Sequence, residues 1–221
     1  MATSWHTLGV EKVIQLLETN VVQGLTQKEA EQRNKTYGPN ALGEEKSVSS
    51  LFLFLSQFKN PLILILLFAG SVTLLLEKYT DSVVILGAML VNAFIGYFQE
   101  QKATKALLEL KKAVKYNALV IRDGTEQQLA QEHLVPGDII LLQEGARVPA
   151  DARILESWEL KINEAVLTGE WLASSKQIEP VAEQTPVADR DTMAYMGSVV
   201  EEGTGKAVVV ATASNTEVGK I

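Results

Sequence analysis

The sequence predicts a membrane α-helical hairpin followed by an all-β domain, with a small N-terminal helical segment before them. Two apolar spans, Pro61–Leu76 and Ser82–Phe98, are separated only by the polar link Glu77–Asp81. After the second span, short β-rich runs bounded by Gly, Pro and Asp continue along the chain. The expected domains are residues 1–50 for the helical segment, 51–116 for the two transmembrane helices with a cytoplasmic stalk, and 117–221 for the β domain.

Composition narrows the possible functions. Hydrophobic residues make up 47% of the chain and are concentrated in the two spans. The net charge is −7, and no Lys/Arg block alternates with aromatic residues, so nucleic acid is not expected as a partner. The absence of cysteine excludes disulfides and thiolate metal sites. His6 and His133 are far apart, so we expect surface or capping residues and no metal site.

The N-terminal segment is predicted to be a two-helix cap without chemistry of its own. Apolar residues at helical spacing between Val10 and Leu17 predict one amphipathic helix. Thr26 and Glu29 have the spacing of a capping box for a second helix, which Gly38-Pro39 would end.

The two apolar spans are short but long enough to cross a bilayer. Each has about 16–17 residues, which gives about 25 Å of helix. Leu51–Phe58 contains polar residues and fits an interfacial lead-in better than part of a span. The alternative is a helical hairpin buried in a soluble core. A short polar link between two nearly uncharged spans argues against that alternative.

Lysines are distributed unequally around the spans. Several lie between Lys102 and Lys115, and Lys46 and Lys59 precede the first span, whereas the link contains only Lys78. The positive-inside rule therefore predicts that both termini are cytoplasmic. From Ser82 to Tyr116 no strong helix breaker occurs, so the second span is expected to continue as a stalk helix beyond the membrane.

From Asn117 the pattern changes to short strands. Asp123-Gly124 between two β-rich runs, residues 118–122 and 125–129, is a strong hairpin signal. Residues Gln177–Asp191 are expected to form an exposed loop. The further predicted strands are Ile139–Gln143, Ala152–Leu155, Met196–Val200 and Lys206–Thr212.

Most of the polar motifs in the β domain are explained by structure alone. Gly203–Lys206 lacks the remainder of a P-loop and is expected to be a strand-connecting turn. Asp138 and Asp151 follow Pro-Gly and Pro-Ala, so side-chain hydrogen bonds that stabilise turns account for them. Thr168-Gly169-Glu170 follows a predicted extended run, Leu160–Leu167, which places Glu170 on an exposed turn. Taken alone, this tripeptide also fits an ordinary turn with a solvated glutamate.

The order of these segments resembles the N-terminal part of a P-type cation-transporting ATPase of the type II, calcium-pump-like branch. Proton pumps are a less similar second, and the heavy-metal branch fits poorly because no Cys-x-x-Cys module precedes the spans. The segments that carry the resemblance are Gly24–Asn40, the second span with Gln99-Glu100, Leu134–Asp138, Val148–Arg153, Glu164–Glu170 and Met196–Lys220.

The resemblance implies a fold and a site. The β domain would be an actuator domain, a distorted jelly roll similar to a double-stranded β-helix. In that family ATP phosphorylates an aspartate in a separate domain, and the actuator loop glutamate then orients and helps deprotonate the water that hydrolyses the aspartyl phosphate. By this match Glu170 is the catalytic glutamate, and Thr168 and Gly169 shape the loop.

The resemblance also implies partners that this chain does not itself supply. ATP and Mg²⁺ are implied for the full-length family, with no cofactor bound by this segment. The implied partners are the lipid bilayer, the phosphorylation and nucleotide domains and the later membrane helices. The implied location is the cell membrane, as a multi-pass protein. The transported cation cannot be inferred, because the ion-binding helices are not in this sequence.

Two departures from the family pattern stand out. The family usually continues after the glutamate with serine and soon a proline, whereas Trp171–Ser175 follows here, with Lys176 back in register. No aspartate is followed by Lys-Thr, so the phosphorylated motif is absent and this chain alone is not expected to be a competent pump. The alternative is a free-standing, membrane-anchored regulatory or interaction protein derived from a pump.

Overall fold

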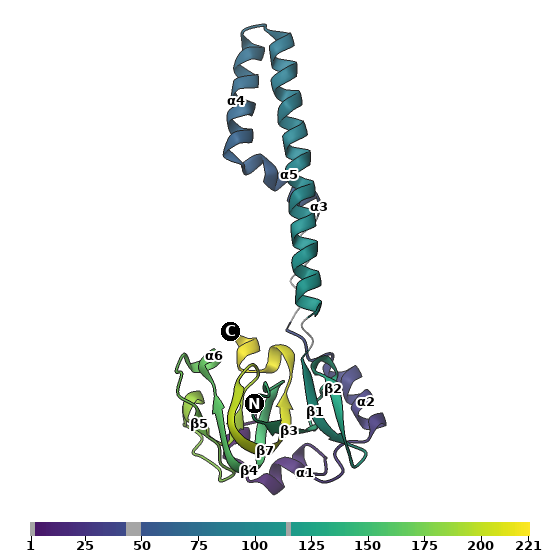
Figure 1. The fold of residues 1–221 in the computed structure, drawn as a ribbon, viewed down its shortest axis with the longest axis vertical. Helices are drawn as coiled ribbons and strands as arrows, with labels where there is room; N and C mark the ends of the chain where they lie inside the picture. The colour runs from purple at the N-terminus through teal and green to yellow at the C-terminus, as the bar shows by residue number, and fades with distance from the viewer. Residues whose placement is uncertain (1–2, 43–49, 114–115) are drawn as a thin grey trace. The chain divides into compact units, whose positions relative to one another are not determined.

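A computed structural model describes residues 3–42, 50–113 and 116–221, which form two compact units (Figure 1). One unit, here called the β unit, combines Met1–Gly43 with Lys115–Ile221. The other, here called the helical unit, is Glu44–Val114. The N-terminal segment and the β strands therefore belong to one compact unit although the hairpin separates them in the sequence. The expected combination of apolar helices with an antiparallel β domain is confirmed.

The β unit is built on one sheet in which all pairs of named strands are antiparallel. The strand order is β2-β1-β3-β7-β4-β5, and β6 pairs with β4 outside this path. Two long strands, β4 and β7, form the centre of the sheet and pair along most of their length. The strands are β1 Asn117–Arg122, β2 Thr125–Ala130, β3 Ile139–Gln143, β4 Asp151–Asn163, β5 Ser174–Ser175, β6 Met193–Ala194 and β7 Val199–Ala211.

The predicted hairpin is confirmed. β1 and β2 pair from Asn117 with Ala130 to Arg122 with Thr125, which leaves Asp123 and Gly124 as the two turn residues. Both turn residues have positive φ, +49° and +73°. Positive φ at both positions is the geometry of the tight turns that match the twist of a hairpin.

The prediction for the end of the chain was wrong in two respects. Met196–Ser198 form a turn, and β7 runs without interruption from Val199 to Ala211. Gly203–Lys206 therefore lie inside a strand, not in a strand-connecting turn. The register of β7 against β4 shifts between Trp158 and Lys161, and Gly203 opposite this shift has φ +77°. A glycine in a strand that marks a bulge looks like a turn in the sequence.

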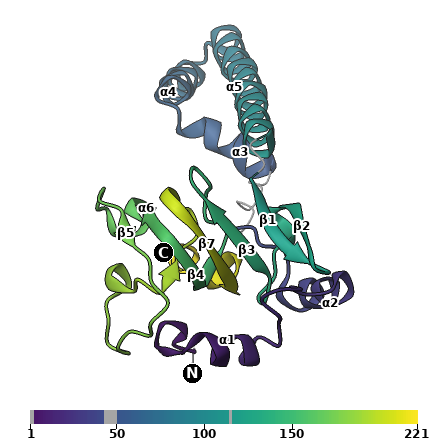
Figure 2. The same cartoon turned by 60° about the horizontal axis from the view of Figure 1, so that its bottom comes forward.

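Two helices of the N-terminal segment belong to the β unit and pack on the part of it that residues 116–221 form (Figure 2). From α1, Val10–Leu16, Val13 is fully buried against Ile139 and Val208 of the sheet. The start of α2, Gln27–Tyr37, has the predicted capping box, and the helix ends at Gly38. The short 3-10 turns of this unit are η1 Trp5–Thr7, η3 Gln131–His133, η4 Val187–Asp189, η5 Ala213–Asn215 and η6 Val218–Lys220.

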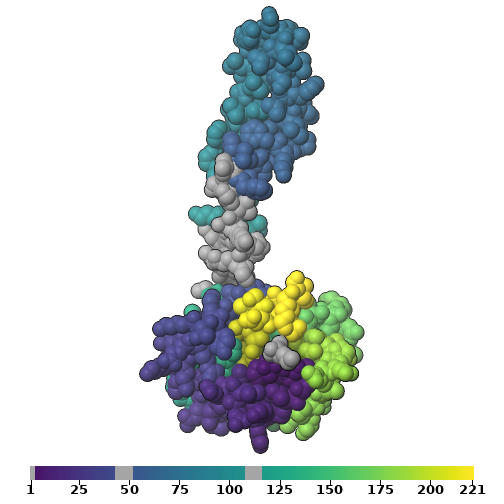
Figure 3. All heavy atoms as spheres, turned by 180° about the vertical axis from the view of Figure 1, so that it is seen from behind, coloured from purple at the N-terminus to yellow at the C-terminus, as the bar shows by residue number. Residues whose placement is uncertain are grey.

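Close backbone contact fixes the entry to α2. Leu25 bridges to Arg122 of β1, and Gly24 before it has φ +66°. A Cβ atom at position 24 would lie 1.8 Å from the carbonyl oxygen of Ile121, so only glycine fits there. In Figure 3 the N-terminal residues, in purple, share one face of the β unit with the C-terminal residues, in yellow.

Polar groups are also buried in the β unit. Asp138 accepts a hydrogen bond from the Val135 amide, as expected of a turn residue, and it also forms a buried ion pair with Arg122 at 2.7 Å. The expectation that His6 is a surface or capping residue was wrong, since His6 is buried and its Nε2 lies 3.2 Å from the Glu183 carbonyl oxygen. His133 is exposed.

The helical unit is a hairpin of two apolar helices with a bent lead-in. Its elements are α3 Ser50–Ser56, η2 Gln57–Lys59, α4 Pro61–Leu75 and α5 Tyr79–Ala113. Asn60 caps α4 through its side chain, and Pro61 takes the first helical position. Gly70 lets the helices approach closely, and the hydroxyl of Ser82 donates to the Gly70 carbonyl at 2.9 Å.

Length and composition identify the candidate membrane spans among the described residues. Tyr79–Leu107 within α5 is long and apolar enough to cross a membrane, with a mean hydropathy of 1.7 and only 17% of the window buried. The pair Phe52–Lys59 and Pro61–Leu75, bent by 74°, forms a second span if both pieces count as one. A helix from a soluble core would be mostly buried, whereas these helices expose Phe68, Leu75 and Phe94.

Candidate functional site

The segment after β4 turns into a short helix. α6, Ala165–Thr168, follows directly on the end of β4 at Asn163. The predicted extended run Leu160–Leu167 was therefore wrong after Asn163. The side-chain oxygen of Asn163 accepts a hydrogen bond from the Ala165 amide at 3.0 Å, which offers the backbone an alternative to the strand ladder.

Gly169 ends this helical turn in the left-handed conformation, with φ +76°. Its amide donates to the Ala165 carbonyl at 2.9 Å. No atom lies within 4 Å of the place where a Cβ would stand, so backbone conformation and not space favours glycine here. The turn directs the chain outward at Glu170.

Thr168, Gly169 and Glu170 form one hydrogen-bonded turn, as their adjacency predicts. The Thr168 hydroxyl donates to the Glu164 carbonyl and accepts from the Glu170 amide, both at 3.2 Å. Glu170 itself is exposed. Within the part of the chain that the structure describes, no side chain pairs with the Glu170 carboxylate. The carboxylate is therefore available to a water molecule or to another domain.

A buried ion pair closes the base of this loop. Lys176 Nζ lies 2.9 Å from Glu164 Oε1, and the side chains are 0% and 4% exposed. Burial raises the pKa of Glu164, and the charge of Lys176 opposes this shift. Glu164 lies in a segment that carries the family resemblance, and Lys176 is the residue at which the family pattern resumes, but nothing in their spacing indicated that they form a pair.

The tip of the loop exposes two large apolar side chains. Trp171 and Leu172 are 85% and 88% exposed. The Trp171 carbonyl accepts a hydrogen bond from the side-chain amide of Asn163 at 3.1 Å. The backbone at Trp171 is therefore anchored to the end of β4, while its indole faces away from the β unit.

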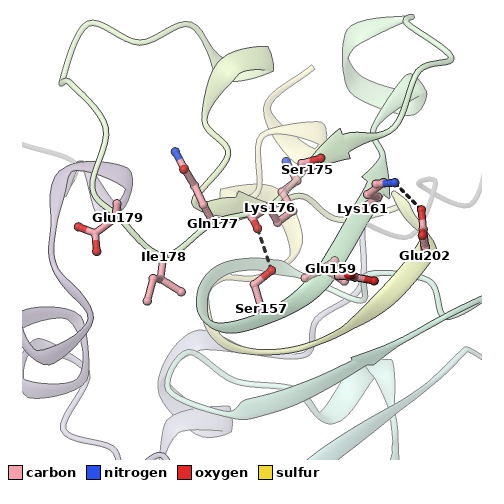
Figure 4. Close-up of a pocket in the computed structure, with 10 residues that line it drawn as sticks. Ser157, Glu159, Lys161, Ser175, Lys176, Gln177, Ile178, Glu179 and Glu202 are labelled. Carbon is pink, nitrogen blue, oxygen red and sulfur yellow. Dashed lines mark hydrogen bonds and ion pairs between the residues drawn. The ribbon is translucent and has the colours of Figure 1, made fainter.

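A polar groove of about 620 Å³ lies beside the loop (Figure 4). Lys161 and Glu202 form an exposed ion pair across its wall. Residues 168–170 do not line this groove, so it is separate from the Thr168–Glu170 turn. The groove is lined by Ser157, Glu159, Leu160, Lys161, Ser175, Lys176, Gln177, Ile178, Glu179 and Glu202.

Asp151 is a second buried acid of the β unit. Its oxygens accept from the amides of Met196 and Glu217, at 2.9 and 2.7 Å. The prediction that Asp151 stabilises its own turn was wrong, because both amides are distant in the sequence. Burial raises the pKa of Asp151 to about 6, against the effect of the two amides. Among the described residues, no group of three or more His, Asp or Glu side chains could hold a metal ion.

Comparison with protein families matches two models to this chain. Residues 112–221 match the P-type ATPase actuator domain, and residues 5–73 match the cation transporter/ATPase N-terminus. The first match contains the whole Thr168–Glu170 turn, and the second covers α1, α2 and α4 up to residue 73.

Curated relatives align along nearly the whole chain. It is 43% identical over 219 residues to the probable cation-transporting ATPase F of Mycobacterium tuberculosis, which covers 99% of this chain and 24% of the relative. It is 44% identical over 211 residues to the cation-transporting ATPase pma1 of Synechocystis, covering 96% and 23%. It is 38% identical over 218 residues to a calcium-transporting ATPase of Bacillus subtilis, covering 98% and 24%. The chain thus spans about a quarter of the length of these relatives.

Proposed function

Because the chain belongs to the P-type cation-transporting ATPase family, of which it is the N-terminal region with the actuator domain, we propose that it works within a membrane pump that moves cations at the expense of ATP. In this proposal the β unit supplies the loop that dephosphorylates an aspartyl phosphate. The aspartate, the nucleotide site and the ion-binding helices come from other parts of the pump. ATP and Mg²⁺, which the family uses, act there.

The observation that carries this proposal is the free carboxylate at the outer end of a fixed turn. Gly169 directs Glu170 outward, and the Thr168 hydroxyl holds the Glu170 amide at 3.2 Å. A general base must reach the proton that it removes, so it has to be exposed and yet held in place. Glu170 meets both conditions.

The chemistry follows from the properties of a carboxylate. Transfer through an aspartyl phosphate divides a difficult hydrolysis into two easier steps. In the second step Glu170 would orient a water molecule and accept its proton as the oxygen attacks phosphorus. Positioned general bases contribute about 10²–10⁴-fold to such steps.

We also propose that the helical unit forms a membrane hairpin of the cell membrane with both ends cytoplasmic. The lysines between Lys102 and Lys115 outnumber the single Lys78 of the link between α4 and α5. The exposed apolar faces of α4 and α5 fit contact with lipid. Movement of the β unit would then be transmitted to the membrane through the helices connected to it.

The test of this function uses the whole pump with Glu170→Gln in this segment. We expect phosphoenzyme to accumulate during turnover with labelled ATP, while cation uptake into vesicles falls about 10²–10⁴-fold. Glu126→Gln, an exposed change in the β1–β2 hairpin, is the control and should leave both quantities unchanged. Normal uptake in the Glu170→Gln pump would remove Glu170 from the mechanism.

A further inference from the structure

The ion pair at the base of the loop needs an explanation beyond stability. Glu164 and Lys176 are almost fully buried, and removing two charges from water is costly. An apolar pair of similar volume often stabilises a fold equally well. The charges here join the two ends of the segment that carries Glu170, which suggests a role in holding that segment.

Lys176 is fixed to the sheet on both sides of its backbone. Its amide donates to the Leu160 carbonyl at 2.8 Å, and its carbonyl accepts from the Ser157 hydroxyl at 2.8 Å (Figure 4). Both partners belong to β4. The backbone of Lys176 is therefore anchored to a central strand. This restricts the position of its ammonium group, which pairs with Glu164.

A continuous chain of contacts leads from Glu164 to Glu170. The Glu164 carbonyl accepts from the amides of Leu167 and Thr168, at 2.9 and 3.0 Å, and from the Thr168 hydroxyl at 3.2 Å. The same hydroxyl accepts from the Glu170 amide. Lys176 thus holds Glu164, Glu164 holds the helical turn, and the turn holds Glu170.

We propose that Glu164 and Lys176 are a positioning pair that fixes where the Glu170 carboxylate meets its water. The inference rests on the proposed function of Glu170, and neither residue touches the reacting atoms. A displacement of about 1 Å at a catalytic group can cost about 10²-fold in rate. Loss of the pair should therefore slow hydrolysis while the Glu170 side chain remains present.

The first experiment measures the loop without any chemistry. The measurement uses this chain held in lipid nanodiscs. After allowance for any change in the free energy of global unfolding, Lys176→Met should speed hydrogen exchange of the Glu170 amide at least about fivefold. Lys176→Arg keeps the charge and should restore slow exchange. Lys161→Met, which removes the exposed lysine paired with Glu202, is the matched control and should leave the Glu170 amide unchanged. Unchanged exchange in folded Lys176→Met would overturn the inference.

Glu164→Gln covers the case in which Lys176→Met does not fold. The amide keeps the shape of the side chain and one acceptor but loses the charge. Faster exchange at Glu170 in this variant, with Leu160 and Ile162 still protected in β4, supports the positioning role. Exchange that matches the original chain contradicts it.

The second experiment separates this inference from the proposed function. In the whole pump, Lys176→Met should slow phosphoenzyme decay about tenfold to a hundredfold with formation unchanged. Combined with Glu170→Gln, it should add nothing, because its effect passes through the missing carboxylate. Additive effects would overturn the positioning role. Normal decay in Glu170→Gln alone would refute the proposed function, and the exchange measurements would then still decide whether the pair holds the loop.

Discussion

Asp151 ties three segments of the β unit together and makes its stability depend on pH. It holds the amides of Met196 and Glu217, and burial is the main reason why its pKa rises from 3.8 to about 6. Among the neighbouring charges, Glu217 raises this pKa further and Lys220 lowers it. The folded chain therefore binds a proton at Asp151 more tightly than the unfolded chain does.

We predict that the free energy of unfolding of the β unit falls as pH rises from about 4 to about 6 and is level above that range. Asp151 would contribute at most about 3 kcal/mol to this fall. Asp151→Asn should remove its share of the slope. Urea unfolding at several pH values, followed by tryptophan fluorescence, measures the difference. An Asn variant with the original slope would assign the effect to another acid, such as Glu164, whose pKa burial also raises.

Trp171 stands where the family usually has serine, and its side chain does not pack into the β unit. Its indole is 85% exposed, so Trp171→Ser should change the free energy of unfolding by less than about 0.5 kcal/mol. Denaturant titration of both forms checks this. A loss above about 1 kcal/mol would show that the indole packs in the folded unit.

In the whole pump we expect phosphoenzyme decay in Trp171→Ser to be as fast as in the original or faster. Slower decay would indicate that the indole packs against the phosphorylation domain.

Single residues also show which parts of the site could be predicted from the sequence and which could not. Thr168-Gly169-Glu170 was singled out by the family resemblance, whereas the exposed turn that it forms could be predicted from neighbours in the sequence. The Glu164–Lys176 pair was missed because burial of a charge depends on the strands that surround it. Asp151 was misread for the same reason, since its partners Met196 and Glu217 come close only in the folded sheet.

At the scale of elements, the capping box of α2 offers a direct measure of local stability. The Thr26 hydroxyl accepts from the Glu29 amide at 3.3 Å, and the Thr26 amide donates to the Glu29 carboxylate at 2.8 Å. The Thr26 hydroxyl also donates to the Glu29 carboxylate at 2.7 Å, and this bond and the one from the Thr26 amide lower the pKa of Glu29. The helix buries only Ala30, so the cap is one of a few contacts that hold its start, together with the bond from the Gln27 amide to the Asp123 carboxylate at 3.1 Å.

Thr26→Ala should therefore destabilise the β unit by about 1 kcal/mol. Thr36→Ala is the matched control, because the Thr36 hydroxyl only bonds back to the Gln32 carbonyl within the same helix. It should be neutral or slightly stabilising, since alanine favours helix. Equal losses in both variants, measured by thermal unfolding, would show that the cap contributes nothing specific.

Elements with a local signal were predicted well, and those shaped by pairing were not. The β1–β2 hairpin, α2 and the two apolar helices follow from turn residues, caps and composition. β7 was divided in the prediction because Gly203 and Gly205 resemble a turn. In the fold Gly203 lies opposite an irregularity of β4, whereas Gly205 pairs with Ser157 and leaves room for the Glu156 carbonyl and the Leu160 side chain.

At the scale of the whole molecule, the hairpin is predicted to place both ends on one side of the membrane. Reporters fused before α1 and after η6 should be cytoplasmic, and a reporter inserted at Tyr79, the start of α5, should be on the opposite side. The reason is the excess of lysines between Lys102 and Lys115, in the C-terminal part of α5 and just after it, relative to the single Lys78 of the α4–α5 link. A cytoplasmic reporter at Tyr79 would exclude the hairpin.

The rate of phosphoenzyme decay tests the central proposal most directly. The pump is phosphorylated with labelled ATP, the label is chased with unlabelled ATP, and formation and decay are timed separately. We expect Glu170→Gln to form phosphoenzyme at the original rate and to lose it about 10²–10⁴-fold more slowly. Decay of the Glu170→Gln phosphoenzyme at the original rate would contradict the account.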